Sequence, residues 1–194
     1  MIAMTLPELA KVLNVSTTAK TAFTGLSIDS RTLSPGNLFI AIIGETTDGH
    51  NYLAEVAAKG AAAVVVSRAV ETTLPQILVK DTTAALGQIG AAWRKQFNLP
   101  IIAVTGSNGK TTLKNMIANI LIAATNNNEN EVLATQGTLN NHWGLPLTLA
   151  RLGKEHRYAA IEMGMNHFGE LALLTRIAQP DVALVNNALR AQSE

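Results

Sequence analysis

Short apolar runs along the chain alternate with segments in which apolar residues recur every three or four positions, and turn residues separate them. Near the start, Thr5 and Glu8 have the T-x-x-E spacing of a helix capping box. The apolar stripe that follows comprises Leu6, Leu9, Ala10 and Leu13. This spacing predicts an amphipathic helix. Two strands are then expected, from Phe23 to Asp29 and from Leu38 to Ile42, with a turn at 34–37 between them.

The same alternation continues to residue 80. A helix is predicted from Asn51 to Lys59, and Gly60 is a residue type that often ends helices. Strands are predicted at Ala63–Val66 and Ile77–Val79. We therefore expect residues 1–80 to form a small α/β domain.

A second α/β domain is predicted for residues 81–194. Asp81 is suited to cap a helix, and Pro100 ends it. The apolar stripe of that helix comprises Leu86, Ile89, Trp93 and Phe97. Further strands are predicted from residue 101 and at 131–134, 158–162 and 182–185. Further helices are predicted to begin at residue 110, to end at residue 152 and to span 169–178. The polar stretch at 125–130 is predicted to be a solvated loop. Strands that alternate with helices imply a parallel, doubly wound sheet.

Ligands of such sheets bind at the carboxyl ends of the strands. Four polar groups follow predicted strands directly. They are the loop at 105–112, the turn at 137–144, Glu162, and the pair Asn186 and Asn187. We expect these groups to meet at one edge of the sheet.

The loop at 105–112 has the layout of a phosphate-binding loop. An apolar strand breaks into a glycine-containing turn, and a helical pattern follows Gly-Lys-Thr at once. Glycines let backbone N–H groups converge on an anion, and the helix N-terminus adds partial positive charge. Lys110 would reach the terminal phosphates, and the Thr111 hydroxyl would help to hold Mg²⁺. Val104 stands where the usual spacing has glycine, and a plain strand–turn–helix corner is the alternative.

Glu162 closes an apolar strand, which is where a protein with a phosphate-binding loop carries a carboxylate for Mg²⁺. A glutamate in a salt bridge is the alternative. Asn166 and His167 precede a predicted helix. A helix N-terminus disfavours the charged form of histidine, so a neutral imidazole could bind a ligand. Capping of the helix by Asn166 is the alternative.

Two further polar segments have two interpretations each. Asn140 and Asn141 either contact a ligand or stabilise their own turn. The segment Ser27 to Arg31 places hydroxyls, a carboxylate and a guanidinium at a strand end. Its arginine could bind a phosphate bidentately, or the segment could be a simple turn. His50 and His156 are expected at the surface.

Composition narrows the class of protein. The 194 residues are 47% hydrophobic and 15% charged, which indicates a folded globular chain. A net charge of +1 gives no indication of a nucleic-acid or membrane-surface partner. Cysteine is absent, which excludes disulfides and thiolate metal sites. The start of the chain lacks the pattern of a signal peptide, and no apolar run is long enough for a membrane span.

The loop at 105–112 resembles the ATP-binding signature of the Mur ligases, which build the peptide of bacterial cell-wall precursors and tolerate a residue such as Val104. Residues 29–50 are similar to the family's uridine-nucleotide substrate domain. The matching motifs there are Asp29-Ser30-Arg31, Pro35 to Ala41, Gly44 and Asp48-Gly49-His50. Within the family, residues 137–149 and 162–170 most resemble the member that acts on UDP-N-acetylmuramoyl-tripeptide and D-alanyl-D-alanine.

The resemblance implies a substrate domain at 1–80 and part of an ATPase domain at 81–194. It implies ATP-driven amide formation through an acyl phosphate, with ATP and Mg²⁺ required. ATP contacts fall on Thr105, Gly106, Ser107, Asn108, Gly109, Lys110, Thr111 and Thr112. Catalytic roles fall on Lys110 and Glu162, and Mg²⁺ binding falls on Thr111 and Glu162. Substrate contacts fall on Ser27, Asp29, Ser30, Arg31, Asn140, Asn141, Asn166 and His167.

Two departures from the family pattern stand out. Family members continue with the rest of the ATPase domain, including a carbamylated lysine, and with a third domain. They also have a metal-binding histidine near the position of Gln192. We therefore expect this sequence not to complete the ligation by itself. Another Mur-type ligase, such as the diamino-acid-adding one, and a non-catalytic nucleotide-binding module are the alternatives. We expect a monomeric, cytoplasmic protein.

Overall fold

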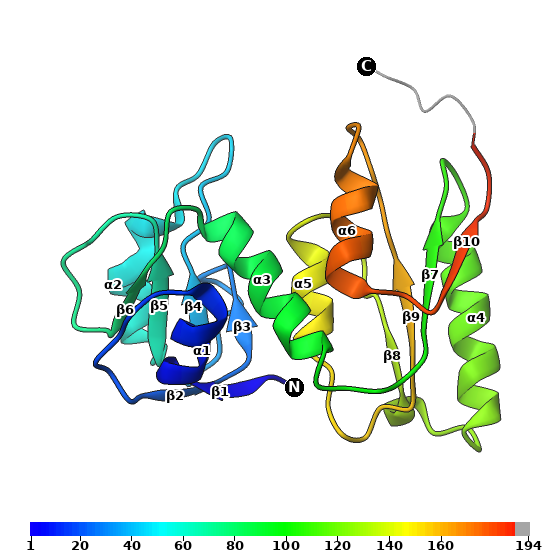
Figure 1. Ribbon diagram of the computed structural model, residues 1–194, viewed down its shortest axis with the longest axis horizontal. Helices are drawn as coiled ribbons and strands as arrows, with labels where there is room; N and C mark the ends of the chain where they lie inside the picture. Colours follow the sequence, from blue (N-terminus) through cyan, green and yellow to red (C-terminus); the bar gives the residue numbers. More distant parts are fainter. Residues whose placement is uncertain (189–194) are drawn as a thin grey trace. The chain divides into compact units, whose positions relative to one another are not determined.

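A computed structural model describes residues 1–188 of the chain (Figure 1). Its internal contacts divide into two compact units, Met1–Ala92 and a second that begins at Trp93. The division falls inside helix α3 (Thr82–Arg94). No helix within residues 1–188 is both long and apolar enough to cross a membrane.

The first unit contains two sheets. Strands β1 (Ala3–Thr5) and β2 (Ala22–Thr24) pair antiparallel. A parallel sheet has the order β3-β4-β5-β6. Its strands are β3 (Leu26–Ser27), β4 (Leu38–Ile40), β5 (Ala63–Val66) and β6 (Gln76–Leu78). The strand expected at 23–29 is thus interrupted at Gly25, whose φ of +77° turns the chain.

The helices of the first unit follow the sequence signals closely. Helix α1 (Leu6–Leu13) has the predicted capping box, because Thr5 Oγ1 accepts from Glu8 N and the Glu8 carboxylate accepts from Thr5 N. The helix expected at 51–59 is a 3₁₀ turn η1 (Gly49–Tyr52) followed by α2 (Leu53–Ala58). Gly60 has a φ of +80°, as expected beyond a helix end.

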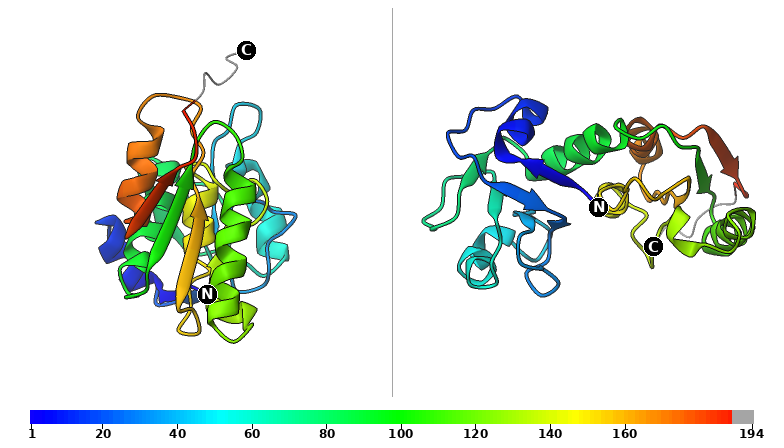
Figure 2. Two further views of the ribbon diagram at one scale, coloured as in Figure 1. Left: turned by 90° about the vertical axis from the view of Figure 1, so that its right-hand side faces the viewer. Right: turned by 90° about the horizontal axis from the view of Figure 1, so that it is seen from below.

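The second unit is a four-stranded parallel sheet of order β10-β7-β9-β8. Its strands are β7 (Ile101–Thr105), β8 (Val132–Ala134), β9 (Tyr158–Glu162) and β10 (Val182–Val185). Its other elements are α4 (Lys110–Ala124), η2 (Glu129–Glu131), α5 (Gly144–Leu149) and α6 (Glu170–Ala178). Helix α4 covers one face of the sheet, and α5 and α6 lie on the other (Figures 1 and 2). The predicted α/β class and parallel sheet are confirmed.

The register of the second sheet explains why its ligand edge is polar. Val104 pairs with Glu162, and Thr105 pairs with Val185. The carboxyl ends of β7, β9 and β10 therefore lie next to one another. The loop at 105–112, Glu162 and the pair Asn186 and Asn187 begin from this edge, as the sequence predicted.

Two predicted helix ends and one predicted solvated loop in the second half were wrong. Helix α3 ends at Arg94 instead of continuing to Pro100, although Phe97 still packs edge-to-face on Trp93 at 5.3 Å. Helix α5 ends at Leu149, three residues before the expected end. The stretch at 125–130 is not wholly solvated. Thr125 is buried, and its hydroxyl donates to the Leu121 and Ile122 carbonyls in the last turn of α4.

Candidate functional site

The loop that follows β7 has the backbone of an anion-binding turn. Gly106 has a φ of +140° and Gly109 a φ of +75°, both in the region that favours glycine. Helix α4 begins at Lys110, directly after Gly109. The Lys110 ammonium donates to the carbonyl oxygens of Gly106 at 2.7 Å and Ser107 at 3.3 Å. The lysine therefore lies folded over the loop whose amides would receive an anion.

Glu162 lies at the centre of the polar edge. The side chain is only 2% exposed. Its Oε2 accepts from the Thr111 hydroxyl at 2.8 Å, and its Oε1 accepts from the Asn140 amide at 2.7 Å. Among residues 1–188, Glu162 has no salt-bridge partner. The salt-bridge interpretation is therefore wrong within the described part of the chain, and the carboxylate joins the loop to the turn at 137–143.

The two asparagines of that turn have different contacts. Asn140 reaches Glu162, and its carbonyl accepts from Gly164 N at 2.8 Å. Asn141 instead accepts from the backbone N–H groups of Trp143 and Gly144, at 3.1 and 2.8 Å. The side-chain oxygen of Asn141 therefore stabilises the start of α5, which is the turn interpretation of the sequence.

Two residues that the sequence reasoning missed support Glu162 from behind. The Thr135 hydroxyl accepts from the backbone N–H of Glu162 at 2.9 Å. The Thr135 carbonyl accepts from the Lys114 ammonium at 2.9 Å, and Lys114 is only 5% exposed. Lys114 follows Lys110 at the i, i+4 spacing of one helix face, which is the signal that could have indicated it.

Asn166 and His167 bond a different carboxylate. Their backbone N–H groups donate to Oε2 of Glu170, at 2.7 and 3.1 Å. These two hydrogen bonds hold the pKa of Glu170 below its usual value. Asn166 does not cap α6, because the N-cap residue is Gly169 and no side chain caps it. Both side chains are exposed.

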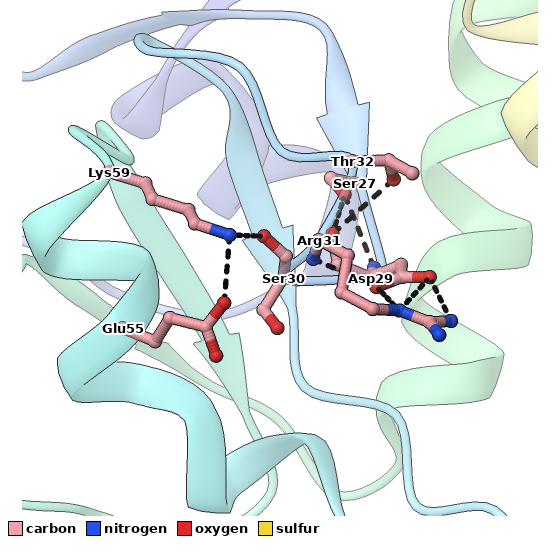
Figure 3. A network of polar contacts seen from close by, with 7 residues as sticks. All are labelled: Ser27, Asp29, Ser30, Arg31, Thr32, Glu55 and Lys59. Atoms are coloured by element: carbon pink, nitrogen blue, oxygen red, sulfur yellow. Dashed lines mark hydrogen bonds and ion pairs between the residues drawn. The ribbon is translucent and has the colours of Figure 1, made fainter.

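The segment from Ser27 to Arg31 forms a network of its own in the first unit (Figure 3). The Ser27 hydroxyl donates to the Asp29 carbonyl at 2.9 Å. The Arg31 guanidinium donates to both oxygens of Asp29, with the shortest distance at 2.7 Å. Hydrogen bonding from Arg31 lowers the pKa of Asp29. An anionic ligand would therefore compete with Asp29 for this arginine.

The neighbouring helix α2 holds the same segment in place. Lys59 Nζ donates to the Ser30 carbonyl at 2.7 Å and to Glu55 at 2.8 Å (Figure 3). Ser27 and Ser30 are both buried. The four substrate residues predicted in this segment are thus brought together, and most of their polar groups already have partners inside the protein.

Of the two histidines expected at the surface, His50 is buried and His156 is half-buried. His50 is 4% exposed, and both of its ring nitrogens have partners: Nδ1 contacts Asp48 at 2.6 Å, and Nε2 accepts from Ser67 N at 3.0 Å. Although burial raises the pKa of Asp48, hydrogen bonds from Arg68 and His50 lower it to about 2. His156 is half-buried, and burial lowers its pKa. Asp48, two residues before His50, was the sequence signal that could have indicated a partner for this histidine.

Gln192, which stands near the family's metal-binding histidine, lies outside the described residues. No group of three or more histidine, aspartate or glutamate side chains within residues 1–188 is arranged to hold a metal ion. A cation at Glu162 would therefore need further ligands from a bound molecule or water.

Two family models match the chain. The Mur ligase family catalytic domain matches residues 22–94, and the Mur ligase middle domain matches residues 104–191. The chain belongs to the Mur ligase family. The loop at 105–112 and Glu162 lie within the middle-domain match, and the segment from Ser27 to Arg31 lies within the other.

Individual family members are similar over most of the chain. The UDP-N-acetylmuramoyl-tripeptide–D-alanyl-D-alanine ligase of Escherichia coli (strain K12) is 43% identical over 100% of this chain and 42% of its own length. A crystal structure of MurF from Acinetobacter baumannii has a TM-score of 0.84 and 38% identity, over 94% of this chain and 40% of that one. MurF from Thermotoga maritima in complex with ADP has a TM-score of 0.73 and 29% identity, over 84% of this chain and 37% of that one. The chain thus spans about two fifths of the curated relative's length.

Proposed function

We propose that this chain supplies the substrate-binding and ATP-binding parts of a ligase that joins D-alanyl-D-alanine to UDP-N-acetylmuramoyl-tripeptide. The observation that carries the proposal is the edge where Thr111 and Asn140 both bond Glu162. The Escherichia coli relative is named as the ligase of these two substrates, which supports their choice here. The reaction would be ATP-driven amide formation through an acyl phosphate, as a cytoplasmic step of peptidoglycan synthesis.

The phosphate-binding loop would position ATP for phosphoryl transfer to the tripeptide carboxylate. Lys110 would leave the carbonyls of Gly106 and Ser107 and contact the terminal phosphates. The backbone N–H groups at the start of α4 would bind the same anion. The contribution of these residues is positioning and charge neutralisation. The ADP complex of the Thermotoga maritima structure supports a nucleotide here.

The residues around Glu162 fit a magnesium ion. The carboxylate is buried, and within residues 1–188 a hydroxyl and an amide are its side-chain partners, with no cationic side chain paired to it. A buried carboxylate without a countercharge is costly, and Mg²⁺ prefers oxygen ligands of this kind. Thr111 and Glu162 would hold the ion. When bound, it would neutralise charge on the nucleotide phosphates.

The substrate side would use the remaining predicted residues. Ser27, Asp29, Ser30 and Arg31 would bind the uridine diphosphate sugar. Asn140, Asn141, Asn166 and His167 would line the substrate or nucleotide side of the second unit. The assignment of residues 1–80 to substrate and 81–194 to ATP remains part of this proposal.

Two alternatives carry different expectations. A diamino-acid-adding Mur ligase would prefer a UDP-sugar peptide one residue shorter. A non-catalytic nucleotide-binding module would bind nucleotide without any UDP-sugar peptide. The identity of 43% to a ligase with the proposed substrates favours the proposal over both.

Calorimetric titration of the chain with UDP-N-acetylmuramoyl-tripeptide tests the proposal. We expect binding by the wild type and a loss of at least about tenfold in affinity for Arg31→Ala, because a bidentate anion contact is removed. Arg157→Ala, which removes an exposed arginine of the second unit, is the matched control and should bind as the wild type does. Binding of the shorter UDP-sugar dipeptide with higher affinity would favour the diamino-acid-adding ligase instead.

A further inference from the structure

The pair Asn186 and Asn187 follows β10 and bonds the phosphate-binding loop with both side chains. Asn187 Oδ1 accepts from the backbone N–H groups of Ser107 and Asn108, both at 3.0 Å. Asn187 Nδ2 donates back to the Asn108 carbonyl at 3.0 Å, and Asn186 Nδ2 donates to the same carbonyl at 2.8 Å. The Asn187 carboxamide thus bonds two N–H donors and one carbonyl acceptor of the loop.

The two loop glycines permit this close approach. A Cβ on Gly106 would lie 3.0 Å from the backbone nitrogen and oxygen of Asn187. A Cβ on Gly109 would lie 2.8 Å from Asn186 Nδ2. A larger residue at position 106 would press on the Asn187 backbone, and one at position 109 would displace the Asn186 carboxamide. The glycines therefore serve the packing of the loop on this pair as well as its φ angles.

Asn187 and Glu162 hold the loop from opposite sides. The strand order β10-β7-β9 places β7 in the middle, so Asn187 comes from the β10 side and Glu162 from the β9 side. Asn187 bonds residues 107 and 108, whereas Glu162 bonds Thr111. Within residues 1–188, the backbone N–H groups from Gly109 to Thr112 have no acceptor. The loop's amides are thus divided into a set bonded by the protein and a set left for a ligand.

We propose that Asn187 is a positioning residue that fixes the phosphate-binding loop in its binding shape before a nucleotide arrives. The amides of Ser107 and Asn108 stay with Asn187, and the phosphates bind the amides from Gly109 to Thr112. Preorganisation of this kind raises affinity because the loop does not need to be ordered on binding. The inference rests on the proposed nucleotide role of the loop, but the contacts of the free chain test it separately.

Hydrogen exchange of assigned amides in the free chain is the first part of the test. We expect Asn187→Ala to speed exchange at Asn108 by about tenfold or more, with core amides of β7 unchanged. The effect at Ser107 should be smaller, because Ser107 N also donates to the Asn187 backbone carbonyl at 3.3 Å, which the variant keeps. Asn187→Asp retains an oxygen acceptor for both amides and should keep their exchange within about threefold of the wild type. Asn128→Ala is the matched control, since Asn128 makes similar local bonds beyond the far end of α4. Unchanged exchange in Asn187→Ala would overturn the proposal.

Titration with Mg-ADP is the second part. We expect Asn187→Ala to bind about tenfold more weakly than the wild type and Asn128→Ala to bind equally well. Bound ADP should shift the amide resonances from Gly109 to Thr112 and leave Ser107 and Asn108 bonded to Asn187. Tighter binding by Asn187→Ala, with large shifts at Ser107 and Asn108, would show that Asn187 occupies the phosphate position and would overturn the proposal. If the wild type binds no Mg-ADP, the proposed nucleotide role fails, and the exchange result alone decides the role of Asn187.

Discussion

The Asn140 amide donates to Glu162 at 2.7 Å, although the two residues are 22 positions apart in the sequence. Asn140 lies in the turn after β8, and Glu162 ends the adjacent strand β9. Because Thr111 bonds the other oxygen of the same carboxylate, the turn, the strand and the phosphate-binding loop meet on one side chain. This arrangement holds the carboxylate where a nucleotide-bound cation would need it.

Asn140→Ala removes the donor to Oε1 of Glu162. We expect Mg-ADP binding to weaken by about tenfold, because the carboxylate that we propose as a magnesium ligand loses a partner that orients it. Calorimetric titration with Mg-ADP measures the effect, and Asn128→Ala serves as the control. Equal affinity for Asn140→Ala and the wild type would contradict an orienting role of this contact.

Lys114→Met removes the ammonium that bonds the Thr135 carbonyl behind Glu162. The methionine fills similar volume but leaves a buried carbonyl without its donor, so we expect a loss of about 1–3 kcal/mol in the free energy of unfolding. Urea denaturation followed by circular dichroism measures this loss. Lys154→Met, at an exposed lysine, should change stability little. A stable Lys114→Met variant would show that the Thr135 carbonyl finds another partner.

Thr148 carries a buried polar group whose removal should stabilise the fold. Its hydroxyl is buried, and no hydrogen-bond partner for it is found within residues 1–188. Thr148→Val replaces it with a methyl group of similar size, and we expect a gain of roughly 1 kcal/mol in the free energy of unfolding. Thr125→Val provides the contrast, because it removes a buried hydroxyl that bonds backbone carbonyls and should destabilise. Destabilisation by Thr148→Val would indicate an acceptor for that hydroxyl in solution.

Asp48 gives a pH dependence with a defined sign. Its pKa in the folded chain is about 2, below the usual value of 3.8. The stability it contributes is therefore fully present above about pH 4 and is lost as the pH falls toward 2. We expect the free energy of unfolding of the wild type to fall more steeply across this window than that of Asp48→Asn. Parallel pH profiles for the two proteins would contradict the assignment.

Local signals predicted most of the fold. The capping box at Thr5, the strand at Ala63–Val66 and the helix after Lys110 are confirmed because a few neighbouring residues determine them. Helix ends were less predictable. Helix α3 stops at Arg94, whose guanidinium bonds carbonyls of Ala178 and Gln179, far away in the sequence. Such long-range contacts leave no local pattern.

The candidate site shows the same limit. Strand ends predicted that the loop, Glu162 and Asn187 would share one edge. The pattern did not distinguish Asn140 from Asn141, because both are turn residues and only the fold decides which one reaches Glu162. The burial of His50 was missed for a similar reason, since its partner Ser67 lies 17 positions away.

A magnesium-dependent titration of ADP into the wild type and Glu162→Gln tests the central claim most directly. Glutamine has nearly the same shape as glutamate but lacks the charge that a cation needs. We expect magnesium to strengthen ADP binding to the wild type. In Glu162→Gln, we expect this magnesium-dependent increase in affinity to be smaller by at least about tenfold. The affinity of Glu162→Gln for ADP without magnesium should equal that of the wild type. The same magnesium-dependent gain in both proteins, or no binding of ADP to the folded wild type, would contradict the claim that this edge is a nucleotide–magnesium site.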